Sequence, residues 1–176
     1  MTQEYNLNPV SFITIATVGV PGRRVFYLQA ARGEEHVTVI IEKEHALALA
    51  ASLDELLAEL EARFPRPSAR PLQADERGLR KQFATLFRVG RMGLGYDEPA
   101  DLVVIIAYQL VLEEDQEPQI ARFWVTRQQV QGLRDQALTA VEGGRPTCEL
   151  CGEPIEPDGH LCPRRNGHGN DPKFAR

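Results

Sequence analysis

The chain has 176 residues, and its 43% hydrophobic content is sufficient for the buried core of one domain plus a short appendage. With 25 acidic and 20 basic residues the net charge is −5, which argues against a general nucleic-acid-binding protein. No run approaches the roughly 20 apolar residues of a membrane-spanning helix, and the first residues lack the basic and apolar parts of a signal peptide. The three cysteines, all within fifteen residues, cannot pair off as a disulfide framework, so we expect a reducing, cytoplasmic environment.

In the first half of the chain, short runs rich in β-branched residues precede one amphipathic pattern. The runs predict strands at 12–18, 25–31 and 37–41. The segment from Gly19 to Gly22 supplies turn residues, so the first two strands are expected to form a hairpin. From Glu44 to Arg63 the leucines recur with the spacing of an amphipathic helix, and a proline-rich segment follows.

The second half repeats this order of elements. Extended segments are predicted at 83–92, 102–112 and 120–125, with a turn over 93–101. A helix is expected to begin at Thr126, because Thr126 and Gln129 form a T-x-x-Q capping box. Gly143 and Gly144 are expected to end it.

When the two halves of the sequence are aligned at an offset of 84 residues, Val37 is aligned with Ala121 and the apolar stripe of one helix with that of the other. We therefore predict an α+β fold with two β-β-β-α pseudo-repeats, at about 11–63 and 83–144, packed as one domain over residues 1–144. Both helices would cover one face of a continuous sheet or of two sheets. Chance recurrence of common elements is the alternative explanation.

The C-terminal segment, residues 145–176, contains every cysteine of the chain. Cys148-x2-Cys151 has the spacing and the following glycine of a zinc knuckle, and His160-x-Cys162 supplies a second pair after a turn-rich loop. The four residues predict a structural zinc site in a small knuckle- or ribbon-like tail. Alternatives are free thiols on an unfolded tail, a redox pair, or a catalytic zinc if one ligand is missing; His168 is a spare candidate in place of His160.

A second candidate site combines four arginines with a glycine-containing strand. These arginines are Arg23, Arg24, Arg88 and Arg91. Together with exposed backbone amides they could bind a phosphate group. The glycine segment lacks the lysine and the following helix of a P-loop, which favours a strand with a glycine bulge. Phe123 and Trp124 are expected in the core, with Trp124 also a candidate for a partner surface. The sequence contains no nucleophile–histidine pair and no carboxylate pair that would indicate an enzyme.

Three segments together resemble a known family: ATVGVPGRRVFYLQA, FRVGRMGLGYDE and RPTCELCGEPIEPDGHLCPRRNGH. They are similar, in this order and from about Ser11 to His168, to an uncharacterised bacterial protein family, domain of unknown function three thousand and ninety. The family carries no established activity. The resemblance implies an association with a lipid-kinase-like and a histidine-phosphatase-like protein, and hence a phosphate-related pathway, but it assigns no catalytic residue.

These observations favour a cytoplasmic, non-enzymatic binding or adaptor protein whose zinc-stabilised tail docks a protein partner, with the kinase-like and phosphatase-like proteins as candidates. One alternative is an enzyme or sensor for a phosphorylated small molecule that uses the four arginines. Another is a nucleic-acid-binding zinc protein, which the equal numbers of acidic and basic residues in the tail disfavour. No membrane partner is expected, and the oligomeric state is left open.

Overall fold

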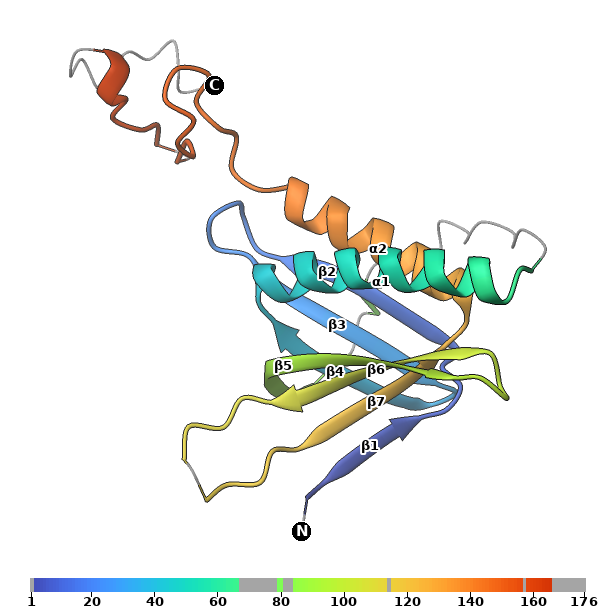
Figure 1. Cartoon of the computed structure of the whole chain (residues 1–176). Helices are drawn as coiled ribbons and strands as arrows, with labels where there is room; N and C mark the ends of the chain where they lie inside the picture. Colours follow the sequence, from blue (N-terminus) through green and yellow to red (C-terminus); the bar gives the residue numbers. More distant parts are fainter. Residues whose placement is uncertain (1, 67–78, 81–83, 114, 157, 166–176) are drawn as a thin grey trace.

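The computed structural model describes residues 2–66, 79–80, 84–113, 115–156 and 158–165 (Figure 1). It is an α+β fold with one seven-stranded sheet in the order β1-β7-β6-β5-β4-β3-β2. The strands are β1 (Glu4–Leu7), β2 (Phe12–Val18), β3 (Val25–Arg32), β4 (Glu35–Ile41), β5 (Thr85–Asp97), β6 (Leu102–Gln109) and β7 (Ile120–Val125). The helices are α1 (Lys43–Arg63), α2 (Arg127–Glu142) and the short 3-10 helix η2 (Pro163–Arg165).

Two antiparallel meanders, β2-β3-β4 and β5-β6-β7, meet at a parallel pair formed by β4 and β5. A parallel pair requires a long crossover connection, and α1 lies within that connection. Each meander is followed by one helix, so the β-β-β-α order expected from the sequence occurs twice. β1 extends the sheet beyond this pattern, because it pairs in parallel with β7 at the opposite edge from β2.

The sequence-based prediction is wrong at two places in the sheet. It missed β1, whose polar and apolar residues alternate over only four positions and become a strand by pairing with β7. It also expected a turn over 93–101, whereas β5 continues through Gly93 and Gly95 as far as Asp97. Continuous pairing with β6 decides this, because Gly93 and Gly95 are in register with Ile106 and Val104. The expected glycine bulge is present earlier in β5, where the register shifts between Val89 and Arg91.

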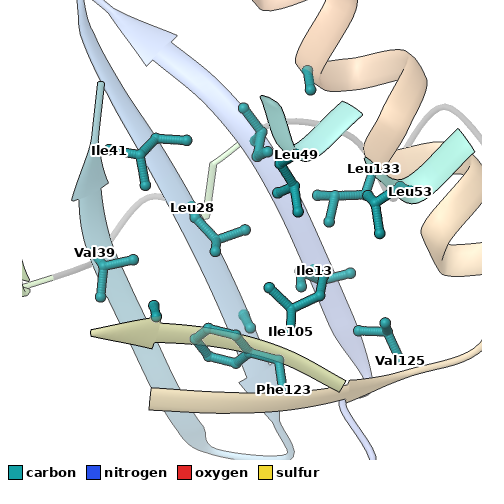
Figure 2. Close-up of a cluster of buried hydrophobic side chains, with 14 of the residues drawn as sticks. Ile13, Leu28, Val39, Ile41, Leu49, Leu53, Ile105, Phe123, Val125 and Leu133 are labelled. Atoms are coloured by element: carbon teal, nitrogen blue, oxygen red, sulfur yellow. The ribbon is translucent and has the colours of Figure 1, made fainter. Parts of the chain in front are cut away.

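The core lies between the sheet and the two helices, which cover the same face (Figure 1). Alternate residues of the strands point toward the helices, and Figure 2 shows them meeting the leucines of α1 and α2. The labelled side chains are Ile13, Leu28, Val39, Ile41, Leu49, Leu53, Ile105, Phe123, Val125 and Leu133. Each of them is almost completely buried, and side chains from both meanders and both helices belong to one contiguous core.

Helix α2 begins at the predicted capping box and then follows the outer edge of β2. Thr126 accepts a hydrogen bond from the Gln129 amide, and the Gln129 side chain accepts one from the Thr126 amide, which confirms the T-x-x-Q box. Further along, Gln136 Oε1 accepts hydrogen bonds from Thr14 Oγ1 at 2.9 Å and from the Ile15 amide at 3.2 Å. The helix therefore satisfies donors of an edge strand that would otherwise be free to pair with another chain.

A charged cluster joins the ends of the two helices to the β5–β6 turn. Asp101 lies in this turn with φ of 53° and is contacted by the Tyr96 hydroxyl at 2.6 Å and by the Arg127 and Arg66 guanidinium groups. Burial raises the pKa of Asp101, but the hydrogen bonds from Tyr96 and Arg127 and the two positive charges outweigh burial and lower this pKa below its ordinary value. Asp101 is therefore a charged carboxylate that connects the β5–β6 turn to the end of α1 and the start of α2.

Candidate metal centre

The four predicted ligands lie in a tail of irregular structure that follows α2. Two isolated β-bridges organise it, one between Thr147 and Pro154 and one between Glu156 and Gly159. The second bridge is closed by a hydrogen bond of 2.8 Å from the Gly159 amide to the Glu156 carbonyl. These two small turns form the framework that carries the side chains of the cluster.

The first turn positions Cys148 and Cys151. The Gly152 amide donates to the Cys148 carbonyl at 2.8 Å, and Gly152 has φ of +76°, a conformation that residues other than glycine rarely adopt. Amide N–H groups of Cys151 and Leu150 donate to the Cys148 sulfur and lower the pKa of this thiol. The turn thus favours the thiolate, which is the form that binds metals.

The second turn brings His160 and Cys162 back to the first. Gly159, with φ of +91°, ends the reversal that begins at Glu156. The Ile155 amide donates to the Pro146 carbonyl at 2.7 Å, which holds the connecting loop against the start of the tail. Cys162 is the buried member of the cluster, whereas the other three donors are partly exposed.

The donor atoms lie close enough together to be compatible with a single metal ion. The three sulfurs and one imidazole nitrogen all lie within 4.8 Å of one another. Cys148 Sγ and Cys162 Sγ are 3.9 Å apart, and Cys151 Sγ is 3.2 Å from His160 Nε2. Zinc–sulfur bonds of about 2.3 Å at tetrahedral corners place two sulfurs about 3.8 Å apart, so the Cys3His set fits such an ion in both chemistry and size.

The charge of the cluster depends on whether a cation is present. The Glu153 amide N–H lowers the pKa of the Cys151 thiol, but burial and the neighbouring thiols of Cys148 and Cys162 outweigh it and raise this pKa. Crowded thiols resist losing their protons together, and a divalent cation among them reverses this effect. Four protein donors would also fill a tetrahedral coordination sphere and leave no position for a water molecule.

Contacts at its first residue attach the tail to the body of the protein. Arg145 forms an ion pair with Glu156 of the tail. The same side chain lies against Gly22 in the β2–β3 turn, where an added Cβ would be 2.8 Å from Arg145 Nε. The glycine at position 22 therefore leaves space for the arginine that connects the two parts. His168, the spare candidate ligand, lies outside the described residues.

The structure distributes the four arginines of the predicted anion site over two separate elements. Arg23 and Arg24 lie between β2 and β3, whereas Arg88 and Arg91 lie on β5. Arg24 Nη1 donates to the Ala140 carbonyl of α2 at 2.7 Å. Arg88 pairs with Glu42, and Arg91 lies over the Tyr108 ring, 3.8 Å from its centroid. Three of the four guanidinium groups thus already have partners within the protein, and the anion site stays a prediction.

One group of interacting residues escaped the sequence analysis altogether. Tyr96, Asp101 and Arg127 form the charged cluster described above, and Arg127, at the start of a helix, lies 26 residues beyond Asp101 along the chain. No spacing pattern marks such a cluster. An aspartate at the predicted turn was the single local signal available.

Fold and cluster together define an α+β protein with a Cys3His cluster compatible with a metal ion. Over residues 5–162 the sequence matches the family described as Protein of unknown function (DUF3090), and the chain belongs to this family. The match ends at Cys162 and so includes all four donors. Neither the curated proteins nor the solved structures contain a match to this chain. Among the described residues, no helix is both long and apolar enough to cross a membrane.

Proposed function

We propose that this chain is a cytoplasmic, non-enzymatic binding or adaptor protein in which a structural zinc ion orders the tail for a protein partner. The observation that carries the proposal is the convergence of three sulfurs and one imidazole nitrogen within 4.8 Å. Cys3His is a usual ligand set for structural zinc, and its four donors leave no open position for catalysis. A reducing compartment would keep all three thiols available for the ion.

The need for an ion follows from the composition of the tail. Its described residues contribute one side chain, Cys162, to the buried hydrophobic residues, so the segment has almost no core of its own. In small segments of this kind the free energy of metal binding supplies the free energy of folding. We therefore assign the ion a structural role.

Two leucines next to the donors support a docking role. Leu150 lies between Cys148 and Cys151 and is 47% exposed, and Leu161 lies between His160 and Cys162 and is 69% exposed. Exposed leucines cost hydration free energy that burial by a partner would recover. Because each leucine is flanked by donors on both sides, the ion would hold both in place.

The proposal is tested with the full chain loaded with zinc and the purified lipid-kinase-like and histidine-phosphatase-like proteins that the family resemblance implies. Calorimetry should detect binding to one of them, with loss of binding after chelation and weaker binding for L150A/L161A. The matched control is L112A, which removes an exposed leucine outside the tail and should leave binding unchanged. Absence of zinc from the purified chain, or binding that survives chelation, would contradict the proposal.

The pseudo-repeat of residues 11–63 and 83–144 remains part of this proposal for the body. The recurrence of the β-β-β-α order supports it. Superposition of β2-β3-β4-α1 on β5-β6-β7-α2 would test it, since unrelated halves would place their helices differently against their strands.

A further inference from the structure

The side of β5, β6 and β7 that faces away from the helices has no helix packed on it among the described residues. The helices pack on one side of β5, β6 and β7, and the alternate residues of these strands point to the other side. We call this second side the open face. The side chains and glycines at its centre are only partly buried, and they are Gly93, Gly95, Val104, Ile106, Tyr108 and Trp124.

The two glycines of the open face have no explanation within the described chain. Neither requires a positive φ, because Gly93 and Gly95 both lie in the regular part of β5. A Cβ at Gly93 would lie 3.9 Å from Ile106 Cβ, and one at Gly95 would lie 3.7 Å from Val104 Cβ, which are ordinary contacts. Glycine weakens a strand, and it often marks a position where another backbone approaches closely. The two glycines thus point to an approaching chain.

Charges at the two ends of this glycine segment have opposite sign. Arg91 and Asp97 lie on the same side of β5 as the glycines, and they are about 20 Å apart at the usual rise of a strand. Arg91 rests on the Tyr108 ring, and Asp97 accepts a bond from the Ala100 amide at 3.3 Å. Within the described part of the chain neither has an ion-pair partner. Along β5 and β6 the open face is therefore basic at one end, acidic at the other and uncharged between them, and the Arg122–Glu4 ion pair lies on the same side of the sheet at β7 and β1.

We propose that the open face binds the open face of a second copy of this chain. The two-fold axis would lie between the sheets, run across the strands and pass between Gly93 and Gly95. This rotation reverses the strand direction, so Arg91 of one protomer meets the partner's Asp97, and the same contact forms a second time. The glycines at the centre permit close packing of two sheets, and Trp124 and Ile106 fill the space around them.

A second copy explains the pattern better than an unrelated partner. An unrelated acidic or basic partner would match a face of one sign, whereas this face carries opposite charges at equal distances from its glycines. Such a pattern is complementary to itself after a two-fold rotation. The inference is independent of the metal centre, because the open face is built from β5, β6 and β7 and includes none of the four donors.

The test measures the dissociation constant of the dimer by sedimentation over a dilution series of the full chain. R91E and D97R should each weaken the dimer about tenfold or more, because each creates two like-charge contacts. The double variant R91E/D97R restores opposite charges and should return the constant to near the wild-type value. E55R changes an exposed charge on α1, on the helix side, and should have no effect.

G95V tests the close approach without changing charge, since the described chain has space for a Cβ at Gly95. We expect a folded monomer, with circular dichroism like that of the wild type. A wild-type chain that stays monomeric throughout the series would overturn the inference. If the double variant R91E/D97R dimerises as weakly as the single variants, the proposed two-fold arrangement is also overturned.

Discussion

Arg127 donates two hydrogen bonds to the same oxygen of Asp101, from Nε at 3.0 Å and from Nη2 at 2.7 Å. Its third nitrogen, Nη1, donates to the Phe64 carbonyl at 2.7 Å. One guanidinium group at the start of α2 thereby holds the end of α1 and the β5–β6 turn. A positive group next to the last carbonyls of a helix is also favourable for the helix dipole.

Removing the charge of Asp101 should destabilise the fold. An asparagine at this position would keep the shape and tolerate the positive φ, so D101N changes mainly the charge opposite Arg127. Both side chains are only about 15% exposed, and we expect a loss of about 2 kcal/mol in the free energy of unfolding, measured with urea. The control is D54N, which breaks an ion pair whose carboxylate is 66% exposed and should cost below about 0.5 kcal/mol.

The same aspartate predicts a pH dependence of stability. The pKa of Asp101 is lowered in the folded protein. Its contribution to the free energy of unfolding is therefore fully present above the pKa of an aspartate in the unfolded chain, about 3.9. That contribution is lost as the pH falls through the lower, folded value. Urea unfolding at a series of pH values should show the difference between wild type and D101N shrinking below about pH 4. A constant difference down to the lowest pH would contradict the lowered pKa.

Gln136 should be important because one oxygen serves two donors of the edge strand. In Q136A the Thr14 hydroxyl and the Ile15 amide would lose their acceptor, which we expect to cost about 2 kcal/mol of stability. Light scattering on heating should also show earlier aggregation, because the outer edge of β2 would be less protected. The neighbouring Q131A, at an exposed position of α2, should behave like the wild type.

The ligand set can be checked by metal analysis. The double variant C148S/C151S should lose one equivalent of zinc per chain and the order of the tail, while the thermal unfolding of the body is unchanged. E149A, within the same turn, should retain the metal. Full zinc content in the double variant would rule out this ligand set.

The two histidines of the tail form a matched pair for a second metal experiment. H160A removes the nitrogen that lies 3.2 Å from Cys151 Sγ, and we expect zinc affinity to fall about a hundredfold or more. H168A should leave the affinity unchanged. The reverse result would show that His168 is the ligand.

The candidate metal centre could be anticipated because its signal is local. All four donors lie within fifteen residues, and the two glycines with positive φ stand directly beside them in the sequence. The predicted anion site of four arginines could not be anticipated in this way, because its signal is not local. Its members lie on separate elements, and whether they meet depends on how the strands are ordered.

Local chemistry in the sequence alone determined the two helices, the capping box at Thr126 and most strands, because periodicity and turn residues act over a few neighbouring positions. Only the tertiary structure decided that residues 4–7 form a strand and that β5 continues through Gly93 and Gly95. Strand pairing and the contacts of Arg127 gain their free energy from residues that are distant along the chain. A pattern within one segment carries no information about such a distant partner.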